Sequence, residues 1–433
     1  NMKELKLTQE FVNESNSTNS NTDKINVIKK YSNQPDVLKV LQYTYDTFKQ
    51  YYVTSKNCKK RSDLVLPFGS YTDIFSLLDA LSSRQITGHS AIEAVNTFVE
   101  ENKEYSDLIW NIIDGNLKTR STISMINKVV PGLIPTFDVA LAQAYDEKTK
   151  KKVDWNDGWY VSRKLDGVRC LTIIDDKGDI NFYSRAGNEF TTLNSLKPSI
   201  QRLGLTNMVF DGEVVSHSFQ DLMKQVHRKS NVQAQDARLC LFDAVPLVEF
   251  KAGKSVMGQR RRSNLLKNWA NIFADSGCVE IIPQIEVNLD EFVGDIEYRD
   301  YNKKMVAEGF EGIMIKDPEA KYECKRSVWW LKQKPFIEVS LSITSVEEGT
   351  GRNVGRLGAL VCEGVDDDKS ISVNVGSGFS DADRDSYWQE RDTVVGQVVE
   401  VRADAVTQNQ DGTYSLRFPR FLRFRGFKAG EKI

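Results

Sequence analysis

The segment Tyr160-Val161-Ser162-Arg163-Lys164-Leu165-Asp166-Gly167-Val168-Arg169 marks the point where the chain changes from a helical to an extended pattern. Tyr160–Lys164 is predicted to form a strand, Asp166-Gly167 a tight turn, and Val168–Ile174 the returning strand of a hairpin. Such a hairpin would place Lys164 at the edge of a pocket with Arg169 close by. A lysine becomes a nucleophile only when it loses its proton, and burial or a neighbouring cation favours that loss. The alternative is an ordinary β-turn with charged surface residues, and the motif alone does not decide between them.

Further short motifs follow downstream in a fixed order. They are Ser184-Arg185-Ala186-Gly187, Phe210-Asp211-Gly212-Glu213, Leu241-Phe242-Asp243, Glu308-Gly309-Phe310-Glu311-Gly312-Ile313-Met314-Ile315-Lys316 and Trp330-Leu331-Lys332-Gln333-Lys334. With the Lys164 motif, this ordered set resembles the covalent nucleotidyltransferase superfamily of DNA ligases, RNA ligases and mRNA-capping enzymes. The resemblance implies that Lys164 is the residue that carries the nucleotide.

Carboxylates and one aromatic residue in these motifs suit a bound nucleotide. Glu213 and Glu311 are of the type that binds Mg²⁺, which typically uses one or two carboxylates together with phosphate oxygens. By resemblance, Glu213 also contacts the ribose and Glu311 helps to bind the metal. Phe242 can stack on adenine, and base–aromatic stacking contributes about 1–3 kcal/mol. ATP and Mg²⁺ are therefore the expected cofactors.

The basic residues of the motifs suit a phosphate chain. Lys332 and Lys334 lie two positions apart, so a strand places both ammonium groups on one face, where they can neutralise the α-phosphate in the transition state. The resemblance gives Lys164, Arg169, Lys332 and Lys334 catalytic roles, and it adds Arg185 and Arg326 to the nucleotide-binding residues. Lys325 competes with Arg326 for its role. Ser162 departs from the family, in which many members have Glu or Gln against the adenine amino group.

The C-terminal segment Leu416-Arg417-Phe418-Pro419-Arg420-Phe421-Leu422-Arg423-Phe424-Arg425 narrows the resemblance to ATP-dependent DNA ligases, in particular those of T-even-type bacteriophages. In a strand, Arg423 and Arg425 share a cationic face that suits pyrophosphate or the DNA backbone. Arg425 and Lys428 are accordingly expected to bind the nucleotide. The family usually ends this motif Arg-x-Asp-Lys, whereas this chain has Arg425-Gly426-Phe427-Lys428.

The sequence predicts a multidomain protein. Residues 1–130 are expected to form an all-α DNA-binding domain, since Pro35–Tyr52, Ser90–Val99 and Tyr105–Ile113 repeat apolar residues at helical spacing; Asn13–Asp23 is polar, low-complexity and predicted as a loop. Residues 131–336 are expected to form an α+β nucleotidyltransferase (adenylation) domain. Residues 337–433, rich in short strands and glycine turns, are expected to form an OB-fold β-barrel.

The composition of the chain also bears on its partners, on metal sites and on membrane contact. The 433-residue chain has a net charge of -2, which gives no sign of a nucleic-acid partner, although the position of basic residues matters more than their sum. Six cysteines are scattered without CxxC pairs, which favours buried, reduced thiols over a zinc site. No apolar run approaches the roughly 20 residues of a membrane span, so a cytoplasmic protein without membrane contact is expected.

The predicted function is ATP-dependent sealing of 5′-phosphate/3′-hydroxyl nicks in duplex DNA by a monomeric ligase, through lysyl-AMP and then DNA-adenylate. An RNA ligase, an mRNA guanylyltransferase and a catalytically inactive nucleic-acid-binding relative are the alternatives. An NAD-dependent ligase is disfavoured, because it would be longer and would carry a four-cysteine zinc finger.

Overall fold

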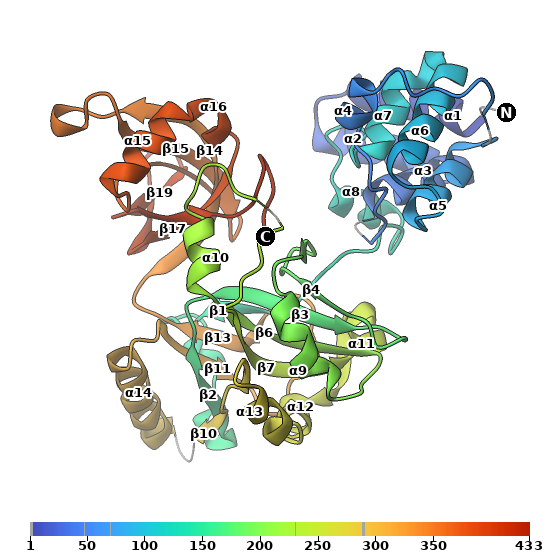
Figure 1. The fold of residues 1–433 in the computed structure, drawn as a ribbon. Helices are drawn as coiled ribbons and strands as arrows, with labels where there is room; N and C mark the ends of the chain where they lie inside the picture. The colour runs from blue at the N-terminus through green and yellow to red at the C-terminus, as the bar shows by residue number, and fades with distance from the viewer. Residues whose placement is uncertain (1–2, 47, 70, 230, 288–290) are drawn as a thin grey trace. The chain divides into compact units, whose positions relative to one another are not determined.

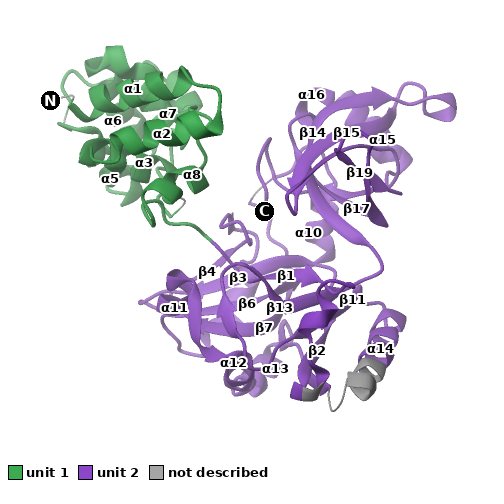
Figure 2. Ribbon diagram, turned by 180° about the vertical axis from the view of Figure 1, so that it is seen from behind, with its two compact units in different colours: residues 1–137 green, residues 138–433 purple. Residues whose placement is uncertain are grey.

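The computed structural model describes residues 3–46, 48–69, 71–229, 231–287 and 291–433. The chain divides into two compact units, residues 1–137 and residues 138–433 (Figures 1 and 2). Of the predicted first domain, residues 1–2, 47 and 70 lie outside the described residues. The division into three domains at 130/131 and 336/337 stays a prediction.

The first unit is helical, as predicted. Its helices are α1 (Lys3–Asn16), α2 (Asn21–Tyr31), α3 (Pro35–Tyr45), α4 (Ser55–Lys60), α5 (Ile74–Ser82), α6 (Gly88–Glu101), α7 (Ser106–Ile113) and α8 (Ile123–Val129). They share a core of buried apolar side chains, among them Phe11, Leu41 and Ile109. The unit therefore has a core of its own.

Two local predictions for this unit were wrong. The polar segment 13–23 is mostly helical, since α1 continues to Asn16 and α2 begins at Asn21. Its small polar residues serve the helix ends: the Ser20 hydroxyl accepts a hydrogen bond from the Asp23 amide at 3.0 Å, which is a typical N-cap. The predicted helix 35–52 ends at Tyr45, and Tyr52 has a left-handed φ of 60°.

Two mixed sheets form the first part of the second unit (Figure 1). One has the order β1 (Leu141–Ala144), β13 (Arg326–Gln333), β11 (Gly312–Lys316), β2 (Trp159–Lys164), β10 (Ile285–Val287). The other has the order β5 (Glu189–Phe190), β4 (Ile180–Tyr183), β3 (Val168–Ile174), β6 (Met208–Val215), β7 (Arg238–Pro246), β9 (Val279–Ile281). The helices are α9 (Lys197–Gln201), α10 (His217–Leu222), α11 (Leu247–Ala252), α12 (Gln259–Lys267), α13 (Ala270–Ser276) and α14 (Glu291–Ala307), and β8 (Lys254–Gly258) pairs with β12 (Lys321–Glu323).

The predicted hairpin around Lys164 is wrong in its pairing, although both strands exist. β2 pairs with β10 and β11, whereas β3 pairs with β4 and β6 in the other sheet. The turn at Asp166-Gly167 therefore passes from one sheet to the other. A Cβ at Gly167 would lie 2.3 Å from the Val214 carbonyl oxygen, so only glycine allows this crossing against β6. Lys164 thus lies at the junction of the two sheets.

Gly312 makes a second close approach. A Cβ there would lie 1.9 Å from the Gln333 carbonyl oxygen, and the residue has a φ of 152°. In the register of β11, Gly312 faces Lys164 on β2, and Ile313 faces Gln333 on β13. This tight packing brings the lysines of β13 next to the end of β2.

The last part of the second unit is an OB-like sheet, as predicted. Its order is β18 (Ala405–Gln408), β19 (Tyr414–Arg417), β16 (Lys369–Val375), β15 (Leu357–Asp366), β14 (Ile337–Glu348), β17 (Val398–Ala403), β20 (Arg420–Phe424), with helices α15 (Asp381–Gln389) and α16 (Arg391–Val394). Its apolar side chains belong to one continuous core with those of the β3–β7 sheet, for example Leu341 with Leu241.

The cysteines are free thiols, and most are buried, which confirms that prediction: Cys58, Cys170, Cys240 and Cys362 are buried, and Cys278 and Cys324 are half-buried. Burial raises the pKa of Cys58 to about 11 and those of Cys324 and Cys362 to about 12. Within the described ranges, no helix combines the length and apolarity that a membrane span requires.

Candidate active site

A pocket of about 190 Å³ lies where the two sheets of the second unit meet strands of the OB-like sheet. Most of the predicted site residues line it: Lys164, Arg169, Arg185, Glu213, Phe242, Arg326, Lys332, Lys334 and Arg425. Glu311 lies beside it, with a carboxylate oxygen 3.1 Å from the Lys164 Nζ. Lys428 does not line the pocket and is exposed, so its predicted place at the nucleotide is not supported.

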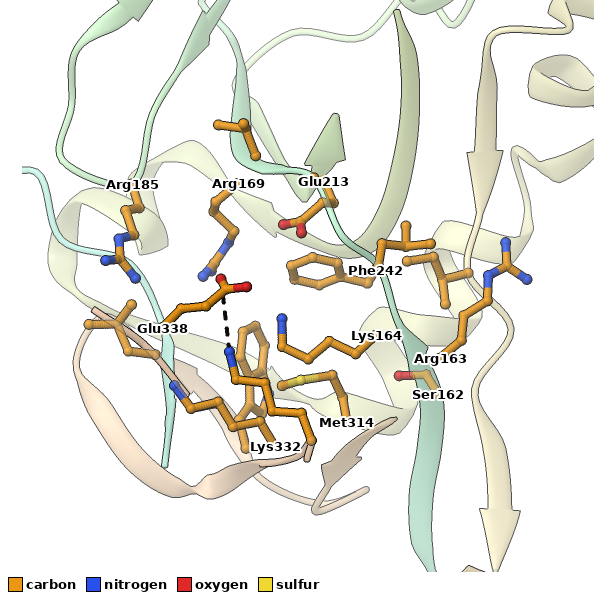
Figure 3. Close-up of a pocket in the computed structure, with 18 of the residues that line it drawn as sticks. Ser162, Arg163, Lys164, Arg169, Arg185, Glu213, Phe242, Met314, Lys332 and Glu338 are labelled. Atoms are coloured by element: carbon orange, nitrogen blue, oxygen red, sulfur yellow. Dashed lines mark ion pairs between the residues drawn. The ribbon is translucent and has the colours of Figure 1, made fainter. Parts of the chain in front are cut away.

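Lys164 occupies the end of β2, and its ammonium group points into the pocket toward Glu213 and Phe242 (Figure 3). Burial lowers the pKa of Lys164, but the nearby carboxylates of Glu311, Glu213 and Glu338 outweigh burial, and the net pKa is raised. The expectation that the surroundings lower this pKa is therefore wrong for this arrangement. Lys164 is a protonated, ion-paired side chain that must leave Glu311 before it can react.

Arg169 is held by the Asp of the Phe-Asp-Gly-Glu motif. Its Nε and Nη2 each donate to Asp211 at 2.5 Å, and Nη2 also donates to the Ala140 carbonyl at 2.8 Å. The Tyr322 hydroxyl donates to the same carboxylate at 2.6 Å. These bonds fix Arg169 in the pocket wall, opposite Glu213 in the β3–β6 register. One guanidinium nitrogen, Nη1, remains for a ligand.

An aromatic wall forms one side of the pocket. The rings of Phe242 and Trp330 meet edge to face at 5.7 Å, and the Lys316 Nζ lies 4.3 Å and 4.0 Å from their centroids. Burial lowers the pKa of Lys316 to about 8. No role was predicted for Lys316 or Trp330, although Lys316 is the last residue of the Glu308–Lys316 motif.

A buried ion pair supports this wall from behind. Arg262 and Asp243 both have fully buried side chains, and their closest approach is 2.8 Å. Arg262 also donates to Gln259 Oε1 at 2.9 Å, and the Trp330 indole donates to the same oxygen at 3.1 Å. The Asp of the Leu-Phe-Asp motif thus positions the aromatic side chains rather than facing the pocket.

Four basic side chains gather on another side of the pocket: Arg185, Arg326, Lys332 and Lys334. Burial and the neighbouring cations Lys334, Lys164 and Arg326 lower the pKa of Lys332 to about 8. Burial also lowers the pKa of Arg185, followed by the repulsion of Arg425. Such a cluster favours a polyanion, because a bound anion relieves this repulsion. Lys325, the competitor of Arg326, lies outside the lining and pairs with Glu323 at 3.1 Å.

Comparisons with known proteins agree with this geometry. Residues 139–334 match the family model described as ATP dependent DNA ligase domain, and residues 348–425 match the model described as DNA ligase OB-like domain. The DNA ligases of Enterobacteria phages T6 and T4 are 25% and 24% identical to this chain, each over 97% of the chain and 96% of the relative. The solved structure titled Pmar-Lig_PreS3 is 36% identical, with a TM-score of 0.57, and the match covers 97% of this chain and 99% of that one.

The chain belongs to the ATP-dependent DNA ligases. It is an enzyme of that class, and ATP is its nucleotide. The alternatives of an RNA ligase, a capping enzyme and an inactive binding protein are thereby set aside.

The OB-like sheet of the ligase contributes arginines to the pocket, but not equally. Arg425 lines the pocket, yet its guanidinium donates to Glu400 and Ser340, each at 2.8 Å, and to the Ile433 carbonyl. Arg423 also lines the pocket, and its contact with Glu400 is longer, 3.7 Å. Arg423 is thus freer than Arg425 to bind a phosphate.

The carboxylates of the ligase that could share one cation are not the pair that the sequence predicted. Among the described residues, Asp166, Glu311 and Glu338 place oxygens within 4.8 Å of one another, and Glu213 is not part of this group. Glu338 also contacts Lys334 at 3.9 Å (dashed line in Figure 3). Sequence reasoning missed Glu338 because it lies on β14, outside the motifs.

Proposed function

We propose that Lys164 is the residue through which this ligase carries AMP. The Lys164 Nζ attacks the α-phosphorus of ATP; the N–P bond forms as the bond to pyrophosphate breaks, and the amine proton is released. The observation that supports this proposal is the position of Nζ in a pocket that combines the Phe242 wall with the cluster Arg185, Arg326, Lys332 and Lys334. A transfer of this kind depends on positioning and charge neutralisation, which these side chains supply.

Two further transfers complete the proposed reaction. The 5′-phosphate at a nick attacks the lysyl-AMP phosphorus, which forms an AMP–phosphate anhydride and returns Lys164 to its free form. The 3′-hydroxyl then attacks the activated 5′-phosphorus, and AMP leaves as the phosphodiester bond forms. In each transfer, cationic side chains offset the charge that builds on the phosphate oxygens.

Intact mass spectrometry of the purified protein tests the first step. After incubation with ATP, the ligase should gain the mass of one AMP, and peptide mapping should place the adduct on Lys164. Addition of pyrophosphate should remove it, because the step is reversible. An adduct on a different lysine would refute the assignment.

We further propose Mg²⁺ as a cofactor, with Glu311 as its main protein ligand and Glu213 facing the nucleotide. Glu311 has a side chain that is only 5% exposed, and burial raises its pKa above the ordinary value despite Lys164. A buried carboxylate next to two others fits a hard divalent cation. When bound, Mg²⁺ would neutralise phosphate charge, while the chain itself orients the nucleotide.

Glu311→Ala is expected to lower the rate of AMP transfer by about 100-fold or more, because it removes the main metal ligand and the partner of Lys164. Glu311→Asp should retain part of the activity if metal binding is the role. The rate of labelling by α-labelled ATP, measured over a range of Mg²⁺ concentrations, checks this. An unchanged Mg²⁺ dependence in the Asp variant would contradict the metal role.

The pH dependence of AMP transfer should report Lys332. Its pKa of about 8 means that it is charged below that pH and loses its charge above it. The second-order rate of labelling by ATP should therefore rise with pH up to about 8, as more Lys164 is deprotonated, and level off above it, because Lys332 then loses its charge. In Lys332→Arg the charge persists, so the rise should continue past pH 8. Identical profiles for the two proteins would contradict a neutralising role for Lys332.

Nicked duplex DNA is the proposed substrate of the ligase, which we propose acts as a monomer in the cytoplasm, and residues 1–137 are proposed to bind the DNA backbone. This segment has its own core, so its removal should leave the second unit folded. The truncated ligase should bind nicked duplex more weakly, with a flatter salt dependence, since each phosphate contact contributes about -0.9 to the log–log slope.

Labelling of Lys164 by ATP should survive this truncation, because the residues that line the pocket lie outside residues 1–137. Binding measured at several salt concentrations, together with labelling, checks both halves of the prediction. Loss of labelling would show that the first unit takes part in AMP transfer.

A further inference from the structure

One arginine of the OB-like sheet reaches the carboxylates around Lys164. The Arg402 Nη2 on β17 lies 3.4 Å from an Asp166 oxygen, 3.0 Å from Glu311 Oε1 and 2.5 Å from Glu338 Oε1. Its guanidinium also stacks on the Phe336 ring, with 3.9 Å between the guanidinium carbon and the ring centroid. A single side chain thus contacts three carboxylates from three separate segments.

These contacts differ in what they connect. Glu338 lies directly opposite Arg402 in the β14–β17 register, so that pair is internal to the OB-like sheet. Asp166 follows β2, and Glu311 precedes β11 in the sheet that carries Lys164. The contacts of Arg402 with Asp166 and Glu311 therefore connect the OB-like sheet to β2, the strand of Lys164, and to β11.

Arg402 and Lys164 share Glu311. The Lys164 Nζ contacts Oε2 at 3.1 Å, and Arg402 contacts Oε1 at 3.0 Å. The Arg402 and Glu311 side chains are 17% and 5% exposed, so solvent screens this contact only weakly. Without Arg402, the ion pairs of the described residues would leave Lys164 and Lys334 to balance three carboxylates that lie within 4.8 Å of one another.

Arg402 also lies on the strand that pairs with the strand of Arg423. β17 pairs with β20, and Glu400 faces Arg423 in that register. Both Glu400 and Arg423 line the pocket. Arg402 is two residues from Glu400. Its ion pairs with Asp166 and Glu311 therefore fix the position of Arg423 relative to Lys164.

We propose that Arg402 is a positioning residue for AMP transfer to Lys164 that is dispensable for joining an already adenylylated nick. This inference rests on the proposed function of Lys164. Arg402 orients Glu311 toward Lys164 and fixes β17–β20 so that Arg423 faces the phosphates of ATP. The final joining step uses neither a free Lys164 nor the pyrophosphate of ATP. It therefore does not need the contacts of Arg402 with Asp166 and Glu311.

The test compares Arg402→Ala and Arg402→Lys with the full-length wild-type ligase. The matched control is Arg391→Ala, which removes an exposed arginine of α16 whose guanidinium donates to the Trp388 carbonyl. Single-turnover labelling by α-labelled ATP reports the first step, and sealing of a pre-adenylylated nicked duplex reports the last. The thermal unfolding midpoint of each variant reports the fold.

Arg402→Ala should slow labelling by about 30-fold or more, as expected when one partner of a buried, hydrogen-bonded ion pair is removed. Sealing of the pre-adenylylated nick should change less than about threefold, and Arg402→Lys, which keeps the charge, should recover part of the labelling rate. Arg391→Ala should match the wild type in both assays.

Three results would overturn the proposal. Equal losses in labelling and in sealing would show a general structural role, as would a lowered unfolding midpoint that Arg402→Lys does not restore. Unchanged labelling in Arg402→Ala would remove the positioning role altogether. If the wild-type protein itself is not labelled, it is the proposed role of Lys164 that fails, which is a different outcome.

Discussion

Replacing Lys164 by alanine is expected to abolish the transfer of AMP from ATP, a loss on the order of 10⁴-fold or more, because it removes the amine that we propose forms the N–P bond. Sealing of ordinary nicks should be lost with it. A pre-adenylylated nick should still be sealed in part, since that substrate enters the reaction after the step that needs Lys164. Labelling by α-labelled ATP and sealing of both substrates measure these effects.

The fold should survive this change, because the Lys164 side chain is 20% exposed and Glu311 keeps its contact with Arg402. Lys164→Arg separates the loss of the nucleophile from the loss of charge, and it should be equally inactive in labelling. Lys325→Ala is a matched control, since Lys325 is exposed and pairs with Glu323 outside the pocket. Normal labelling of Lys164→Ala would refute the assignment of Lys164 as the residue that carries AMP.

The largest effect on stability is expected for Arg262→Ala. Its partner Asp243 would remain fully buried without a counterion, and removal of one partner from a buried ion pair costs about 3–5 kcal/mol. The carbonyl oxygens of Met257 and Ala320 would each lose one of two donors, since Ser255 Oγ and the Gln259 amide also donate to them. The urea midpoint of the second unit, followed by tryptophan fluorescence, should therefore fall markedly.

Arg260 provides the control for this prediction. It lies on the same helix, but its side chain is 37% exposed, and it pairs with Glu286 and Glu319 at the surface. Exposed pairs of this kind contribute about 0–1 kcal/mol, so Arg260→Ala should shift the urea midpoint little. Similar shifts for the two variants would show that the burial of the Arg262–Asp243 pair does not matter.

The sequence motifs correctly predicted which residues line the pocket when those residues lie on a single strand. Lys332 and Lys334 alternate on β13, and both line the pocket, as the two-residue period of a strand requires. Phe242 on β7 and Glu213 on β6 were found in the same way. Their catalytic and binding roles stay predictions.

The motifs did not predict which strands pair, or which motif residues support others. Tyr160–Lys164 and Val168–Ile174 are adjacent in sequence, and the sequence favoured a hairpin, but a turn that crosses between two sheets has the same residue pattern. No role was predicted for the acidic residues Asp211 and Asp243, which bind Arg169 in the pocket wall and the buried Arg262, respectively.

Contacts between distant segments were beyond the sequence argument altogether. Arg402 lies more than ninety residues after Glu311 in the chain, in a strand whose pattern of apolar residues only indicates a barrel. Arg425 shows a related limit: its place in a cationic motif predicted a phosphate ligand, which stays a prediction, but did not indicate that its guanidinium donates to Glu400, Ser340 and Ile433. Both depend on tertiary packing that no local pattern encodes.

The protected cysteines make this ligase a convenient subject for site-specific probes. A maleimide reacts with exposed thiolates, whereas Cys58, Cys170, Cys240 and Cys362 are buried, and burial raises the pKa of each of them above its ordinary value. One cysteine introduced on α6 and another on α15 would therefore carry most of the dye under brief labelling, with Cys278 and Cys324 as the sites to replace first. Fluorescence energy transfer between those dyes would report whether the distance between α6 and α15 changes when nicked duplex DNA is added.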